Sequence, residues 1–249
     1  RAYDASGQRL MHLQASIEGY DVFARSLSIG AETMVMHFRP ELPMHDRYAV
    51  DHDFLTPETG DEVLTISRLI NAFFRWEFNS CETLIRGTDA YPIDYANACP
   101  DVAVTSLHYY FPWAMSALLK WSVFCVVTGR EPRLDLDTRR YFEIGDREDL
   151  TYEEKLAGYR ELADEYFEVD RYRDFCDSRL PHVDELVLEL FPDDAQLRAN
   201  SAKFAKAFDS YGFSANKILS LFSRKQDWER DARVLTDQYS PANLLNLER

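Results

Sequence analysis

Strand-like runs joined by turn signals fill the first hundred residues, and this pattern limits the possible folds more than any other feature. Residues 15–27 and 33–39 are rich in β-forming side chains and are separated by the turn Ile29-Gly30-Ala31-Glu32, which predicts a hairpin. Residues 75–85 and 91–97 flank the turn Gly87-Thr88-Asp89 and predict a second hairpin. The first part of the chain is therefore expected to contain an antiparallel sheet.

The segment between the two hairpins divides into a loop and a helix. Residues 40–60 contain prolines and few aliphatic side chains, which predicts a long surface loop. Asp61 is expected to cap a helix, because apolar residues follow it at helical spacing. This apolar face comprises Val63, Ile66, Leu69, Ile70 and Phe73.

After Pro112 the pattern becomes helical. The apolar stretch 107–127 contains Pro112 and Lys120, and it is expected to be a buried helix and not a membrane span. Thr151 and Glu154 form a capping-box sequence, which predicts a helix start. We therefore expect an α+β subdomain over residues 1–110 and a helical extension over residues 111–249. Further helices are expected at residues 170–180, 182–191, 194–208 and 214–232.

The charge balance and the cysteines narrow the class of protein. The chain has 43 acidic residues against 28 Lys and Arg, a formal net charge of −15, which argues against nucleic acid as the main partner. The four cysteines are scattered without a CxxC pair, so we expect reduced thiols in a cytoplasmic protein. No membrane association is expected.

Two carboxylates are expected to meet across the second hairpin. If the turn is centred near Thr88, Glu82 lies opposite Asp94, within reach of a directly opposed side chain. Adjacent carboxylates repel unless a cation or a shared proton compensates. Asn97 adds a neutral oxygen, and oxygen ligands of this kind suit Mg²⁺. The alternative is that both carboxylates simply occupy a solvated sheet face.

This order of residues resembles the end of the ATP-grasp fold, in which an acidic residue on one strand is followed by a carboxylate, an Asn and a Pro. Glu82, Asp94, Asn97 and Pro100 match that order, although Asp stands where Glu is usual and precedes Asn by three residues where two is usual. The resemblance implies that Glu82, Asp94 and Asn97 hold Mg²⁺. Because the match is inexact, Glu77 remains a rival to Glu82 as a ligand.

Three further positions carry the resemblance to particular branches. Ser106 stands where D-alanine–D-alanine ligases have a serine soon after the Asn and Pro, which implies a place near the cofactor. The stretch containing Glu18 and Asp21, followed by Gly30 and then by Arg39, is similar to a strand pair of ribosomal-protein glutamate ligases. In that comparison Glu18 and Asp21 also lie near the cofactor, and Arg39 stabilises charge on the transferred phosphoryl group. The alternative is an ordinary strand-end arginine paired with a carboxylate.

The resemblance implies an ATP- and Mg²⁺-dependent ligase that activates a small-molecule or peptide carboxylate as an acyl phosphate for attack by an amine or similar nucleophile. The glycine-rich loop and lysines that grip the nucleotide in this superfamily are not recognisable in these 249 residues, and we expect them upstream. The rival expectation is a non-catalytic adaptor with a degenerate ATP-grasp scaffold, which acts on a protein partner through the acidic helical part.

Overall fold

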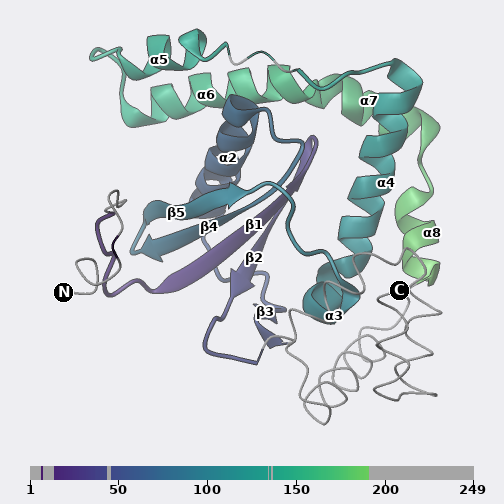
Figure 1. Ribbon diagram of the computed structural model, residues 1–249, viewed down its shortest axis with the longest axis horizontal. Helices are drawn as coiled ribbons and strands as arrows, with labels where there is room; N and C mark the ends of the chain where they lie inside the picture. Colours follow the sequence, from purple (N-terminus) through teal and green to yellow (C-terminus); the bar gives the residue numbers. More distant parts are fainter. Residues whose placement is uncertain (1–6, 8–13, 44–45, 134, 136, 191–249) are drawn as a thin grey trace.

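The computed structural model describes residue 7 and residues 14–43, 46–133, 135 and 137–190. The protein is α+β: a five-stranded antiparallel sheet with helices, followed by a helical segment (Figure 1). The strands follow the order β3-β2-β1-β4-β5 across the sheet. Their bounds are β1 Val22–Ile29, β2 Glu32–Phe38, β3 Tyr48–Ala49, β4 Phe78–Arg86 and β5 Asp89–Asn97.

Both predicted hairpins are confirmed, with one corrected boundary. The pair β1–β2 turns at Gly30, whose φ of +55° favours glycine. A Cβ added at Gly30 would lie 1.9 Å from the Trp121 ring, so the turn also depends on close packing against a helix. The first strand begins at Val22 and not at residue 15, because its ladder partners on β4 end at Ile85.

The prediction that residues 40–60 form only a loop is wrong at two places. Residues Tyr48–Ala49 form β3, which pairs with the end of β2 at the sheet edge. Helix α2, Pro57–Phe74, begins before the expected cap at Asp61. Its N-cap is Thr56, whose hydroxyl accepts a hydrogen bond from the Thr59 amide, and Pro57 occupies the first helical turn. Thr at the N-cap followed by Pro is a typical helix start, so the helix begins here and not at the acidic residue Asp61.

Helix α2 covers one face of the sheet and contacts all four long strands. Val63 packs with Ala24 and Ile85, while the Ser26 and Ser67 hydroxyls meet at 2.5 Å. The remaining residues of the predicted apolar face, Ile66, Leu69, Ile70 and Phe73, line an apolar groove of about 400 Å³ beside β5. Helix α6, Tyr152–Phe167, packs on the other side of α2, so sheet, α2 and α6 form successive layers (Figure 1).

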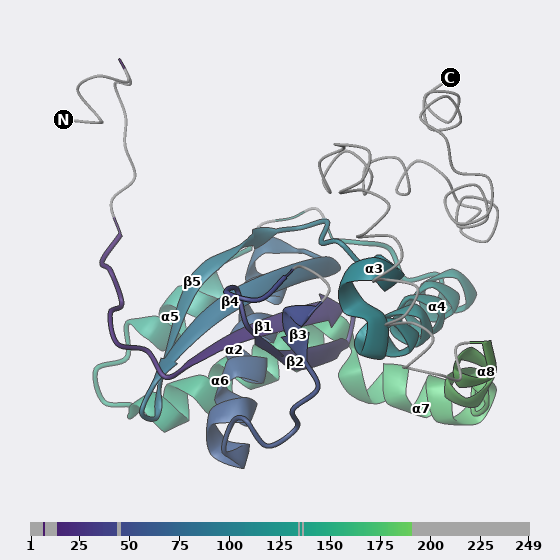
Figure 2. The same ribbon diagram turned by 90° about the horizontal axis from the view of Figure 1, so that it is seen from below.

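A second group of helices lies at one end of the sheet (Figure 2). Phe111, Trp121 and Phe124 of α4 join the core that contains Leu27 and Ile29 of β1. The helices after residue 110 thus share a hydrophobic core with the sheet, and the expected domain division at this point stays a prediction. These elements are α3 Val104–Leu107, the 3₁₀ turn η2 His108–Tyr110, α4 Phe111–Thr128, α7 Val169–Arg179 and α8 Val183–Leu190.

One helical stretch among the described residues, His108–Thr128, is long and apolar enough to cross a membrane by length and composition alone. Core helices share this property. One face of it, including Ala114, Ala117 and Phe124, is buried against the rest of the protein, whereas Val126 and Val127 are exposed. The expectation of a buried helix therefore holds for one face of α4 only.

The later helices begin and end close to the predicted residues. The capping box is confirmed: Thr151 Oγ1 accepts from the Glu154 amide, and the Glu154 carboxylate accepts from the Thr151 amide at 2.8 Å. A short helix, α5 Arg139–Gly145, precedes α6 and was not predicted. The helices expected at residues 194–208 and 214–232 lie outside the described residues.

Candidate functional site

The two carboxylates of the second hairpin lie opposite each other, as predicted. Glu82 on β4 pairs directly with Asp94 on β5. Asp94 is exposed at the sheet edge, whereas only 24% of the Glu82 side-chain surface is exposed. This pairing brings one partly buried and one exposed carboxylate together on neighbouring strands.

Two register shifts in β5 decide which way Asp94 and Asn97 face. Between the pairs Thr83–Pro92 and Glu82–Asp94, β5 has one extra residue; between Glu82–Asp94 and Ser80–Asn97 it has another. In a regular strand alternate residues share a face, so Asp94 would lie on the same face as Pro92 and opposite to Asn97. Each shift reverses that alternation.

The consequence is a polar row on the face away from α2. The Asn79 side chain on β4 contacts α2. Because side chains alternate along a strand, Ser80 and Glu82 lie on the opposite face of the sheet. Their partners Asn97 and Asp94 accordingly share this outer face, although three residues separate them. The Asn97 amide nitrogen donates to Ser80 Oγ at 2.9 Å, so its carbonyl oxygen is the atom that could bind a cation.

Arg25 belongs to the same row, and the sequence reasoning missed it. It lies opposite Glu82 on β1, with its Nη1 3.6 Å from Glu82 Oε1 and its Nη2 3.4 Å from Ser80 Oγ. The guanidinium also lies over the Phe38 ring, 5.2 Å from its centroid. Alternation along β1 could have found it, since Arg25 is the only basic residue within an otherwise uncharged strand.

The electrostatics of the row follow from burial and charge. Burial raises the pKa of the Glu82 carboxyl, the neighbouring Arg25 opposes that shift, and Asp94 adds to it. Burial also raises the pKa of the Tyr48 hydroxyl, beneath the same guanidinium. The site therefore holds two carboxylates and one cation, and a further cation would relieve the remaining repulsion.

The donor set fits Mg²⁺ only as an incomplete shell. In the part of the chain that the structure describes, no group of three or more His, Cys, Asp or Glu side chains converges on one point. Glu82, Asp94 and the Asn97 carbonyl nevertheless offer oxygen ligands on one face. Mg²⁺ is commonly held by one or two carboxylates with waters and substrate phosphates completing its shell, so this set suits a metal that arrives with a phosphate ligand.

Two predicted residues have structural partners away from this row. Glu77 accepts from Arg130 Nη1 at 3.0 Å and from the Tyr166 hydroxyl at 2.7 Å, which ties the residue before β4 to the segment after α4 and to α6. Ser106 is buried and donates to Asp101 Oδ2 at 2.9 Å within the first turn of α3. Neither is brought to the Glu82–Asp94 pair by these contacts.

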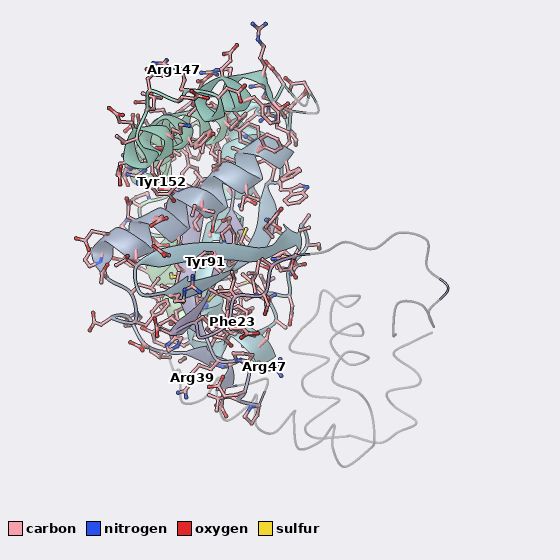
Figure 3. All side chains as sticks on the ribbon, turned by 90° about the vertical axis from the view of Figure 1, so that its left-hand side faces the viewer. Phe23, Arg39, Arg47, Tyr91, Arg147 and Tyr152 are labelled. Carbon is pink, nitrogen blue, oxygen red and sulfur yellow. The ribbon has the colours of Figure 1, made fainter. Side chains whose placement is uncertain are left out.

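The remaining predicted residues are exposed. Glu18 precedes β1, and Asp21 accepts a hydrogen bond from the Gly87 amide at 2.7 Å, which fastens the hairpin turn. Arg39 follows β2 and pairs with Glu41 at 2.9 Å. Figure 3 shows Arg39 beside Arg47, at the opposite end of the body from Arg147. Its local pairing matches the alternative of an ordinary strand-end arginine, and its role in charge stabilisation stays a prediction.

Comparisons with known proteins give one short match. No family model matches the chain, and no solved structure matches it. A polyamine aminopropyltransferase from Vibrio vulnificus (strain CMCP6) is 36% identical over 59 residues. That match covers 24% of this chain and 20% of the relative, so the chain spans about a fifth of that protein's length.

Proposed function

We propose that this chain carries the metal-binding, catalytic part of an ATP-dependent ligase of the ATP-grasp type. The observation that supports the proposal best is the polar row of Arg25, Glu82, Asp94 and Asn97 on the sheet face that α2 leaves uncovered. The row combines oxygen ligands for Mg²⁺ with a guanidinium for phosphate, which is the pairing that phosphoryl transfer requires.

In the proposed reaction, a substrate carboxylate oxygen attacks the γ-phosphorus of ATP, and the bond to the β-phosphate oxygen breaks to release ADP. An amine then attacks the carbonyl carbon of the acyl phosphate, loses a proton and displaces inorganic phosphate. Bound Mg²⁺ would offset charge on the phosphate oxygens. Within the row, Glu82, Asp94 and Asn97 would hold the metal, and Arg25 would orient a phosphate oxygen through its planar fork.

The short match to an aminopropyltransferase does not favour its activity here, because it covers so little of either chain. The non-catalytic adaptor remains the second candidate. It is favoured by the exposure of Asp94 and by the small number of converging acidic ligands among the described residues. Metal binding separates the two candidates.

The test uses a chain that includes the expected upstream nucleotide-gripping part. It is titrated with Mn²⁺ in the presence of ATP, and electron paramagnetic resonance compares the free ion with that in a protein-free Mn²⁺–ATP control. The wild-type chain should bind Mn²⁺, and Asp94→Asn should weaken this binding. Asp89→Asn is the matched control, since Asp89 lies on the same strand at the hairpin turn. Equal binding by all three proteins, or none by the wild type, would reject the metal site and favour the adaptor.

A further inference from the structure

A buried pair of asparagines lies directly behind the polar row. Asn79 of β4 is 0% exposed and Asn71 of α2 is 1% exposed. The Asn79 side-chain nitrogen donates to Asn71 Oδ1 at 2.7 Å and to the Tyr95 carbonyl oxygen at 3.1 Å. One side chain thus connects the covering helix with the edge strand.

The Tyr95 carbonyl lies in the segment of β5 where the second register shift occurs. Tyr95 belongs to the two-residue interval between Asp94 and Asn97 that opposes the single residue Cys81 on β4. An extra strand residue disturbs the regular ladder, and a partly buried carbonyl at such a point needs a donor. Asn79 supplies that donor to Tyr95, and its side chain lies on the face of the sheet opposite to Glu82.

The direction of this hydrogen bonding follows from the partners. The atoms near the Asn79 nitrogen are all acceptors: a side-chain carbonyl oxygen, a backbone carbonyl oxygen and, at 3.5 Å, the Cys81 sulfur. Only the amide end of Asn79 can satisfy them. Aspartate has nearly the same shape but presents only acceptors when ionised. Leucine fills a similar volume without any donor.

We propose that Asn79, held by Asn71, is a positioning residue that fixes the irregular segment of β5 and thereby aligns Asp94 and Asn97 with Glu82. This inference rests on the proposed function, because it takes metal binding to be the purpose for which Asp94 and Asn97 are aligned with Glu82. Asn79 acts through the backbone of Tyr95 and does not touch the metal. The arrangement parallels metal sites in which outer hydrogen bonds orient the ligands.

The test compares Asn79→Leu and Asn79→Asp with Ser67→Ala. Ser67 lies in the same buried layer between α2 and the sheet, where it pairs with Ser26 and not with β5. All three changes should lower the melting temperature. Only the two Asn79 variants should weaken Mn²⁺ binding in the presence of ATP, by about 10–100-fold, measured well below the melting temperature. A loss of the same size in Ser67→Ala, or unchanged Mn²⁺ affinity in both Asn79 variants, would overturn the positioning role.

Hydrogen exchange separates failure of this inference from failure of the proposed function. The β5 amides between Asp94 and Asn97 should exchange faster in Asn79→Leu than in the wild type, and should be unchanged in Ser67→Ala. If the wild type binds no Mn²⁺, the proposed function fails and the assignment to metal alignment fails with it, even when exchange shows that Asn79 holds the strand. If the wild type binds Mn²⁺ and β5 exchange is unaffected in Asn79→Leu, the metal site stands and the inference about Asn79 is overturned.

Discussion

The guanidinium of Arg25 lies 3.6 Å from the Glu82 carboxylate across two neighbouring central strands. Both side chains are largely removed from water, with 20% and 24% of their surfaces exposed. The contact balances one of two adjacent carboxylates and leaves Asp94 as the more accessible one. In the proposed ligase, an incoming metal–phosphate complex would meet Asp94 and Arg25 on the same face.

Arg25→Lys should weaken binding of ATP with Mn²⁺ while changing stability less. Lysine keeps the charge beside Glu82 but loses the fork that can contact a carboxylate and a phosphate together. We expect a loss of about 1.5–3 kcal/mol in binding free energy, the range for hydrogen bonds to charged groups. Calorimetric titration of both proteins with ATP and Mn²⁺, each in a chain that includes the expected upstream nucleotide-gripping part, measures this loss. Equal affinities would limit Arg25 to its structural pair with Glu82.

Arg39→Lys tests the role implied by the resemblance. If Arg39 meets the transferred phosphoryl group, turnover by a chain that includes the expected upstream nucleotide-gripping part should fall by about 2–4 kcal/mol of transition-state stabilisation. Its stability should hardly change, since Arg39 is half-exposed and pairs with the exposed Glu41. The readouts are kcat and a thermal melt. Unchanged turnover would return Arg39 to an ordinary surface pair.

Much of the fold could be predicted because local signals and tertiary packing agree. The turn at Gly87 and Thr88 fixes the register of its hairpin as far as the pair Thr83–Pro92. The predicted pairing of Glu82 with Asp94 is correct, but it arises from the extra residue after Pro92, because the turn register alone would place Ile93 opposite Glu82. The capping box at Thr151 likewise needs only neighbouring residues. The predicted cap of α2, Asp61, lies five residues after the actual N-cap Thr56, because the loop expected over residues 40–60 includes Thr56 and Pro57.

The shape of the site could not be predicted in the same way. The extra residues in β5 follow no local turn signal, and the second shift is associated with a hydrogen bond from Asn79, sixteen residues from Tyr95. Arg25 reaches Glu82 only because β1 pairs with β4, a contact between segments far apart in sequence. Glu77 is a reasonable ligand by residue type, but its partners Arg130, just after α4, and Tyr166 of α6 reach it only through packing between segments far apart in sequence.

Glu77→Gln should therefore lower stability without changing Mn²⁺ affinity. Arg130 is 5% exposed in its side chain and would lose one of its two carboxylates, retaining Glu168 at 3.4 Å. We expect a loss of about 1.5–3 kcal/mol in the free energy of unfolding, measured by urea denaturation. A variant that unfolds like the wild type but loses Mn²⁺ binding would restore Glu77 as a metal ligand.

Glu82→Gln should alter the pH dependence of stability. Burial and Asp94 raise the folded-state pKa of Glu82, so the folded protein holds this proton more tightly than the unfolded chain. The contribution of Glu82 to stability is therefore favourable at low pH and is lost as pH rises from about 4.3, the ordinary glutamate value, through the raised folded pKa. The variant should gain stability relative to the wild type across that window and keep the gain at pH 7. Urea denaturation between pH 4 and 7 measures the difference; a gap that narrows as pH rises would contradict it.

Asp94→Asn gives opposite outcomes for a metal ligand and for a structural partner. Without metal, removing the charge relieves repulsion on Glu82, so the melting temperature should stay the same or rise slightly. The gain in the free energy of unfolding should be less than about 1 kcal/mol. With Mg²⁺ and ATP, a wild-type chain that includes the expected upstream nucleotide-gripping part should melt at a higher temperature because it binds both, whereas the same chain with Asp94→Asn should show little or no increase. A carboxylate that only balanced a cation would behave differently, since its loss would lower stability whether or not metal is present.

Thermal melts of the variant and of the control Asp89→Asn, each with and without Mg²⁺ and ATP, distinguish these cases. A variant that melts lower without metal and still gains as much as the wild type from Mg²⁺ and ATP would exclude Asp94 as a ligand.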